Sequence, residues 1–251
     1  MSLGLISQNY FLNITRNPMV TTGAEPTDVD IVPLQDGGFA ATWVARGGSF
    51  LTDQGLYFGT FDANGAPIVP AQLLVPGNSI RFGSNPPSDI AALAAGGFVI
   101  VWDDNDLGAL TALVLNSNGT SRSELISVET NTSFVPDIGV VSLPNGGFRV
   151  LWEGPDGSVD GVFGRSFDSS GADTGDAEQV NPEAEGNQRG QSAAVLTDGT
   201  AVTAFTESAI GTSFPVVRIV GDGLILSVNL GAECPLEGIS NPSLVALSNG
   251  G

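Results

Sequence analysis

Hydrophobic residues recur along the chain in short stretches separated by glycine-containing turns. In one stretch, Phe98, Ile100 and Trp102 occupy alternate positions, so an extended strand would place all three on one face. The intervening Val99 and Val101 are apolar too, as expected for a strand that is covered on both faces. Comparable stretches occupy residues 39–43, 148–152 and 201–205. The pattern predicts four equivalent strands that are buried from both sides.

Each of these strands belongs to a longer repeat. The segment 31–43 returns as 90–102 and 140–152, more loosely as 193–205, and begins again at 244–251. The aligned first glycines, 50 to 59 residues apart, are Gly37, Gly96, Gly146, Gly199 and Gly250. Glycine next to Asn, Asp or Ala can take the positive φ angles of a two-residue hairpin. An apolar strand therefore precedes each turn, and the aromatic strand follows it.

A second landmark follows each complete repeat's glycine turn by 23 to 28 residues. It reads FDANG at residues 61–65 and recurs in looser form at 115–119, 167–171 and 219–223. A third strand is expected to end in this turn, and a shorter fourth strand, such as 71–75, to follow it. The chain thus contains four complete repeats of four strands each and the beginning of a fifth.

Four strands in about 50 residues, apolar on both faces and repeated without helices, predict an all-β fold whose repeats are the blades of a β-propeller. A β-sandwich repeat normally needs about 100 residues for its own two-sheet core. We predict a single propeller domain. Its expected parts are N-terminal closing strands at 1–26, blades at 27–85, 86–134, 135–187 and 188–240, and the first strand of the closing blade at 241–251.

Closure of the ring would give five blades. The N-terminal segment 4–20 has Tyr10, Leu12 and Ile14 in alternation, and residues 242–247 repeat the pattern of a first strand. A composite closing blade built from both segments would hide the sheet edges that an open array exposes. The alternative is that the chain is a fragment of a longer repeat protein.

Composition narrows the possible chemistry. The chain has 27 acidic and 8 basic residues, a net charge of −19 and no His, and all eight basic residues are Arg. Histidine triads, histidine metal sites and the phosphate-binding lysine of a P-loop are therefore excluded. A chain this acidic repels phosphate backbones and anionic membranes, so we expect neither a nucleic-acid partner nor a membrane span. Cys234 is the single cysteine, which rules out an intramolecular disulfide. We expect a monomer.

The repeat resembles one that occurs in a known group of proteins. The pattern Leu-x-x-Gly-Gly-Phe-x-x-x-Trp, followed by Phe-Asp-x-x-Gly, is similar to tandem propeller-like repeats of very large secreted or cell-surface bacterial proteins. Those repeats often accompany haemolysin-type calcium-binding repeats. The likeness covers residues 27–251 and implies a secreted or cell-surface location, although residues 1–18 show no signal peptide. The glycine-rich calcium-binding nonapeptide of haemolysin-type proteins does not occur in this sequence.

Acidic residues follow the second strand in three of the repeats. Asp103, Asp104 and Asp106 come directly after one of these strands and offer the carboxylate oxygens that calcium prefers. We expect a solvated acidic turn and no bound cofactor. The alternative is that these three residues are ligands of a weak Ca²⁺ or Mg²⁺ site. The other acidic residues at these positions are Glu153, Asp156 and Glu207. A second, weaker metal candidate consists of Asp168, Asp173 and Asp176.

A set of mostly polar residues lies four positions before the key leucine of each repeat: Asp30, Asp89, Gly139, Ser192 and Ser243. In a closed propeller these positions approach the axial channel together. Hydrolysis of a glycosidic bond needs two carboxylates at a set separation, one of them with a raised pKa. We expect these side chains to cap the ends of the inner strands. The alternative is that Asp30 and Asp89 are a catalytic pair.

Two functions are compatible with these observations. The main prediction is a non-enzymatic propeller module of an exported bacterial protein, serving as a binding, adhesion or spacer surface for an unknown protein or carbohydrate ligand. The alternative is a carbohydrate-binding or glycoside-hydrolysing five-bladed propeller with Asp30 and Asp89 as its channel carboxylates. Fold alone does not decide between them.

Overall fold

The computed structural model describes most of the repeat region of the chain. The described residues are 25–46, 54–80, 88–130, 137–181, 186–208, 216–221, 224–229 and 242–246. They form strands, turns and connecting segments without any helix. No helix that could span a bilayer is therefore found in these ranges. The predicted all-β class is confirmed.

Within these described ranges, sixteen strands form four antiparallel sheets of four strands each, and every sheet follows the chain order. The first sheet contains β1 (Glu25–Pro33), β2 (Phe39–Arg46), β3 (Gly55–Phe61) and β4 (Pro67–Pro76). The second contains β5 (Ser88–Ala92), β6 (Phe98–Asp104), β7 (Ala109–Leu115) and β8 (Ile126–Thr130). The third contains β9 (Ile138–Ser142), β10 (Phe148–Gly154), β11 (Gly161–Phe167) and β12 (Glu178–Gln179). The fourth contains β13 (Asn187–Val195), β14 (Ala201–Ser208), β15 (Val216–Gly221) and β16 (Leu224–Asn229).

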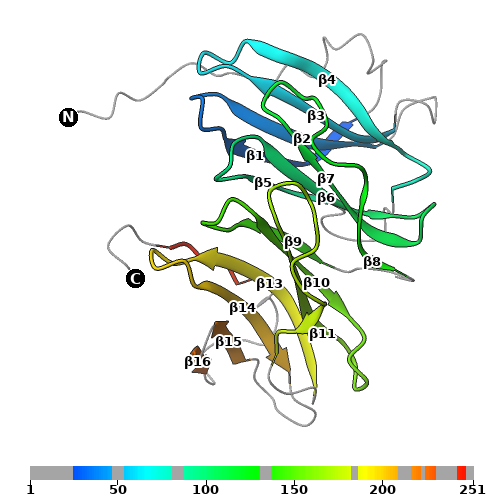
Figure 1. Cartoon of the computed structure of the whole chain (residues 1–251). Coiled ribbons are helices and arrows are strands. Elements are labelled where there is room, and N and C mark those ends of the chain that lie inside the picture. The colour runs from blue at the N-terminus through cyan, green and yellow to red at the C-terminus, as the bar shows by residue number, and fades with distance from the viewer. Residues whose placement is uncertain are drawn as a thin grey trace.

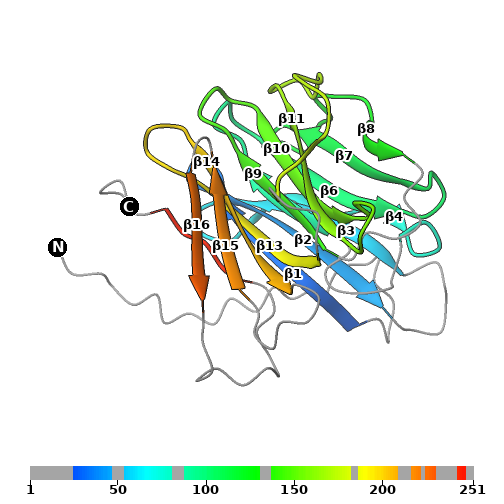
Figure 2. The same cartoon turned by 90° about the horizontal axis from the view of Figure 1, so that it is seen from below.

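The first strands of the sheets lie next to one another. Strand β1 contacts β5, β5 contacts β9, and β9 contacts β13. The four sheets consequently follow one another along a curve, as the blue-to-orange order of the ribbon in Figures 1 and 2 shows. This is the arrangement of blades around a propeller axis, with the first strand of each blade innermost.

The two sequence landmarks of each repeat touch each other. A Cβ atom added to Gly38, Gly97 or Gly147, the second glycine of each Gly-Gly pair, would lie 2.1 to 2.2 Å from a backbone carbonyl oxygen. Those oxygens belong to Phe61, Leu115 and Phe167, the first residues of the second landmark. The second glycine is therefore required because the end of the third strand passes directly over the hairpin.

The hydrophobic core lies between adjacent sheets. One cluster joins Phe58 of β3 to Phe98 and Trp102 of β6, and all three are buried. The rings of Phe58 and Phe98 are 6.1 Å apart and tilted. A second cluster joins Val101 of β6 to Trp152 of β10. A single sheet of about 50 residues thus gains its core only by packing against its neighbours.

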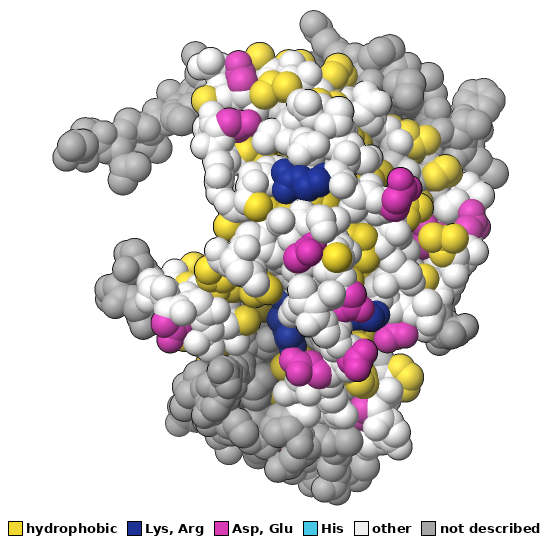
Figure 3. Space-filling model, viewed as in Figure 1, with side chains coloured by type: hydrophobic (Ala, Val, Ile, Leu, Met, Phe, Trp, Pro, Cys, Tyr) yellow, Lys and Arg dark blue, Asp and Glu magenta, His cyan; other side chains and the backbone are white. Residues whose placement is uncertain are grey.

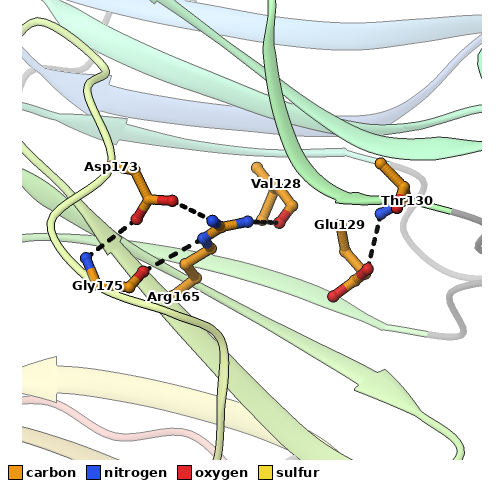
Figure 4. Close-up of polar contacts among 6 residues, drawn as sticks. All are labelled: Val128, Glu129, Thr130, Arg165, Asp173 and Gly175. Atoms are coloured by element: carbon orange, nitrogen blue, oxygen red, sulfur yellow. Dashed lines mark hydrogen bonds and ion pairs between the residues drawn. The ribbon is translucent and has the colours of Figure 1, made fainter.

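Arg165 connects two sheets at their outer strands. It extends from β11 and its Nη1 donates a hydrogen bond of 2.9 Å to the carbonyl oxygen of Val128 in β8 (Figure 4). On the other side it pairs with Asp173, whose second carboxylate oxygen accepts a hydrogen bond of 3.0 Å from the Gly175 N–H. Contacts of this kind hold neighbouring blades together away from the inner strands.

The segment 242–246 lies beside the fourth sheet. The backbone N–H of Leu244 donates a hydrogen bond of 3.1 Å to the hydroxyl oxygen of Ser192 in β13. This is the place where a fifth blade would have its first strand. The predicted N-terminal closing strands, 4–20, lie outside the described residues.

Candidate functional site

One end of the inner strands carries a row of carboxyl groups. In the second and third blades this end is the start of the first strand and the end of the antiparallel second strand. In the first blade the corresponding position follows the bulge of β1. The row crosses three blades. Its members are Asp30 of β1, Asp89 of β5, Asp137 directly before β9, and Glu153 of β10. We call these four residues the carboxyl row.

Asp89 lies at the junction between the second and third sheets. Its Oδ2 accepts a hydrogen bond of 2.7 Å from the N–H of Val140 in β9, and its Oδ1 accepts one of 2.7 Å from the N–H of Ile90. Burial raises the pKa of Asp89 to about 7, with a further contribution from the charge of Asp30, although the two N–H donors oppose this rise. Asp89 is therefore a carboxyl group that is partly protonated near neutral pH.

Asp30 is the neighbour of Asp89 on the first blade. It is partly buried, and this burial, together with repulsion from Asp28, raises its pKa above the ordinary value. Asp28 lies in a β-bulge of β1 and has a positive φ of 50°, which is uncommon for a residue other than glycine. Bulges and positive φ angles of this kind are frequent beside functional sites.

Asp137 and Glu153 face each other across the β9–β10 pair. Glu153 donates its backbone N–H to the carbonyl oxygen of Asp137 at 3.3 Å, and both side chains are buried. Burial, followed by repulsion from Glu153 and from Asp89, raises the pKa of Asp137 to about 7. The two carboxyl groups form a buried pair behind Asp89, and we call them the buried pair.

Glu153 is also held from the fourth blade. Its Oε1 accepts a hydrogen bond of 2.5 Å from the N–H of Gly190 in β13. Burial raises the pKa of Glu153, whereas the Gly190 N–H and the charge of Arg189 oppose the rise. Arg189 in turn pairs with Asp160, Nη2 to Oδ2, at 2.9 Å. Gly190 lies in a β-bulge with a φ of 64°, at the same place in β13 as Asp28 in β1.

The structure also bears on the capping hypothesis for the inner-strand positions. Asp89 accepts the N–H of Val140, and Ser192 accepts the N–H of Leu244, so both side chains bind the first strand of the following blade. The Asp89 side chain therefore caps the following strand and is at the same time a candidate catalytic carboxyl group. Ser192 cannot supply a carboxyl group, so only the first two blades place an acid at this position.

Asp104 and Asp106, two of the three predicted calcium ligands, accept hydrogen bonds within the protein. Asp104 Oδ2 accepts from the Trp102 Nε1 at 3.1 Å, and its Oδ1 accepts from the N–H groups of Asp106 and Leu107. Asp106 Oδ2 accepts a hydrogen bond of 2.5 Å from the Ser79 hydroxyl. The Asp103 side chain is buried in β6. Within the described parts of the chain, no three His, Cys, Asp or Glu side chains are grouped to hold a metal ion. The assignment of Asp103, Asp104 and Asp106 as calcium ligands stays a prediction.

The second metal candidate is dispersed in the same way. Asp168 Oδ1 accepts a hydrogen bond from the Ser170 hydroxyl and further ones from the N–H groups of Ser170 and Ala172, and these bonds lower the pKa of Asp168. Asp173 binds Arg165 and Gly175. Asp176 is exposed. Asp168 and Asp173 thus each bind N–H groups of their own turn.

Comparison with known proteins identifies the fold and not the family. No family model and no curated protein matches the sequence. Among solved structures, an alpha-L-arabinanase from Penicillium chrysogenum is similar at 12% identity, with a TM-score of 0.55 over 82% of this chain and 66% of that one. A protein of unknown function from Dyadobacter fermentans is similar at 9% identity, with a TM-score of 0.52 over 83% and 70%. An alpha-L-arabinofuranosidase from Lactobacillus brevis has 13% identity and a TM-score of 0.46 over 94% and 82%.

These likenesses support a β-propeller fold. The chain spans about two thirds of the length of the arabinanase that it resembles. They also overturn the main functional prediction. A non-enzymatic adhesion or spacer module was expected, but the solved structures of similar fold include an alpha-L-arabinanase, so this prediction is corrected.

Two members of the carboxyl row were not singled out as site residues from the sequence. Asp137 lies two positions before Gly139. Only the aligned position of each repeat was compared, which is Gly139 in the third repeat, and Asp137 was therefore not included. Glu153 stands out only as one of the acidic residues after the second strand. Each repeat could instead have been compared at two positions, the start of its first strand and the end of its second strand. That comparison would have placed Asp137 and Glu153 at the same end of the sheet. The bulge that carries Gly190 to Glu153 has no counterpart in the sequence pattern.

Proposed function

We propose that this protein is a carbohydrate-directed β-propeller that hydrolyses glycosidic bonds at the carboxyl row. Support comes chiefly from one observation: Asp89, partly buried and with a pKa of about 7, is coupled to the charge of Asp30. Glycoside hydrolysis requires one carboxyl group that still holds a proton and a second that is ionised. The surroundings of Asp89 favour its protonated form more strongly than those of Asp30 do, as this chemistry needs.

The roles of the two residues follow from their pKa values. Asp89, whose pKa is raised further, is the proton donor to the leaving glycosidic oxygen. Asp30, whose pKa is raised less, is the ionised partner on the other side of the bond. It either attacks the anomeric carbon or takes a proton from a water molecule that does so. Water supplies the hydroxyl group of the new reducing end in both cases. If Asp30 attacks, Asp89 takes the proton of the water that later cleaves the glycosyl–enzyme bond and is thereby restored. If Asp30 acts as the base, it takes the water proton and passes it to solvent, and solvent returns a proton to Asp89.

Charge supports a substrate without negative groups. The net charge is −19, and acidic side chains are spread over the face seen in Figure 3 with few arginines among them. A polyuronate or a sulfated glycan would be repelled by this surface. A neutral polysaccharide outside the cell fits this proposal, as does the secreted or cell-surface location that the repeat resemblance implies.

The test is hydrolysis of a panel of neutral polysaccharides and aryl glycosides. Asp89→Asn and Asp30→Asn should each lower kcat by about 10²- to 10⁴-fold, because each removes one of the two carboxyl groups. Asp198→Asn is the matched control, since the equivalent position of the third repeat is Asn145 and both side chains accept a turn N–H. Unchanged rates in both active-site variants, or no hydrolysis by the parent protein, would reject the proposal.

We also propose that the propeller closes with five blades. The hydrogen bond from Leu244 N–H to Ser192 repeats the one from Val140 N–H to Asp89, so 242–246 lies where the first strand of a fifth blade belongs. Removal of residues 1–20 should then lower the melting temperature by several degrees, because the closing blade would lose its remaining strands. A truncated protein with an unchanged melting temperature would contradict the five-bladed arrangement.

A further inference from the structure

Arg189 and the β13 bulge lie next to the buried pair and have no part in the proposed reaction. The bulge gives Gly190 a φ of 64° and directs its N–H at Glu153 Oε1, 2.5 Å away. Arg189, the residue before it, is 58% exposed and is fixed by Asp160 at 2.9 Å and by Asn187 Oδ1 at 3.1 Å. One N–H donor and one cation thus approach Glu153 from the neighbouring blade.

Asp137, the other member of the buried pair, has a different environment. It is flanked by acidic groups on both sides, Glu153 on β10 and Asp89 on β5. Two carboxylates in a buried site cannot both ionise easily, so a proton stays on one of them. The contacts described above determine which one.

We infer that Arg189 and the Gly190 bulge are positioning elements that make Glu153 the ionised member of the buried pair and leave the proton on Asp137. The inference rests on the proposed function in one respect, namely that Asp89, which lies near the buried pair, is the proton donor. Asp137 directly precedes β9, the strand whose Val140 N–H binds Asp89. A protonated Asp137 adds no second charge beside the proton donor, and Asp89 then loses its proton at a lower pH than it would beside an ionised neighbour.

Among the described residues, the charged groups that act on Glu153 come from three elements or the segments next to them. Asp137 lies across the β9–β10 pair, Asp160 precedes β11, and Arg189 belongs to β13. Repulsion from Asp160 raises the pKa of Glu153, and attraction to Arg189 lowers it. Since Asp160 also pairs with Arg189, removal of the guanidinium leaves both acids without their cation.

The experiment is a carbon-13 NMR titration of the side-chain carboxyl groups, assigned with Glu153→Gln and Asp137→Asn. In Arg189→Gln, the Glu153 midpoint should rise by about half a unit to one unit, since an exposed cation is partly screened. The Asp137 midpoint should fall, because the last proton of the buried pair is then shared more evenly between Asp137 and Glu153, so that Asp137 loses its proton at a lower pH. Arg189→Lys should restore both midpoints. Shifts in opposite directions would not arise from a merely structural role.

The matched control is Arg149→Gln, because Arg149 also pairs with an acidic residue, Glu178 of the outermost strand β12 at 2.6 Å, and lies near the other end of β10 from Glu153. It should leave both midpoints unchanged. An unchanged Glu153 midpoint in Arg189→Gln, or shifts of both residues in the same direction, would overturn the inference. Because the titration needs no substrate, its outcome is independent of whether the protein hydrolyses a glycan. If hydrolysis is found, Arg189→Gln should also move the alkaline limb of the kcat profile to higher pH, with Arg189→Lys restoring it.

Discussion

At the residue scale, the carboxyl groups of the inner strands combine two tasks that are usually separate. Asp89 binds the N–H of Val140 on the next blade and still has a pKa near 7. Its hydrogen bonds favour the ionised form, and its burial disfavours it more strongly. A side chain that fixes the junction between blades is thereby kept close to the pH at which it can give up a proton.

The raised pKa of Asp137 predicts how stability depends on pH. Its value in the folded state is about 7, against about 3.8 without the fold, so the folded state binds the proton more tightly. The stabilisation is complete below about pH 4 and is lost as the pH rises through 7. The wild-type melting temperature should therefore fall between pH 5 and pH 8.

Asp137→Asn should be more stable than the wild type at pH 8, by roughly 1–3 kcal/mol, because it removes a buried group that must ionise. The remaining pH dependence should come from Asp89, Asp30 and Glu153, whose pKa values are also raised. Denaturant titrations of the folded protein at pH 5 and pH 8 measure this difference, with Asp198→Asn as the control. A variant with the same slope as the wild type would show that Asp137 is not a raised carboxyl group.

At the element scale, the hairpin between the first two strands of each repeat depends on its second glycine. A methyl group on Gly147 would lie 2.2 Å from the carbonyl oxygen of Phe167. Gly147→Ala should therefore lower the free energy of unfolding by about 2–3 kcal/mol, since backbone would have to move. The measurement is equilibrium denaturation.

Gly175→Ala is the control for this substitution. Nothing lies within 4 Å of a Cβ atom at that position, and its φ is not in the left-handed region. A change within about 0.5 kcal/mol is expected there. Equal effects of the two substitutions would show that crowding under the third strand is not the reason for the glycine.

The same elements show what could be predicted from sequence. The alternation of Phe98, Ile100 and Trp102 predicted β6, and the glycine turns predicted the strand order of each sheet, because both are local in the chain. The contact between Gly97 and Leu115 and the bulge at Gly190 were not predicted. They depend on how strands from different parts of the chain meet. Asp137 and Glu153 were missed as a pair for the same reason, since only the β9–β10 register brings them together.

At the scale of the whole molecule, stability depends on packing between sheets. Trp102 is 2% exposed and lies in the cluster that joins the first and second sheets. Trp102→Ala should lower the free energy of unfolding by about 3–5 kcal/mol. Trp102→Phe should cost much less, because the fourth repeat carries Phe205 at the same position.

Hydrogen exchange gives the more telling measurement for Trp102→Ala. If the sheets unfold as one cooperative unit, the amides of the β13–β14 pair should lose protection as much as those of β5–β6 do. Loss confined to the first two sheets would mean that the blades unfold independently. In that case the stacked arrangement would not be a single folding unit.

The contact between the second glycine and the end of the third strand lies wholly inside one repeat. A gene segment that encodes one repeat therefore carries both halves of that contact with it. Duplication, loss or exchange of whole repeats leaves every such hairpin intact, whereas a breakpoint between the two motifs separates partners that must match. Recombination in this lineage is expected to preserve the interval from the Gly-Gly pair to the following turn, and to vary the connections between sheets.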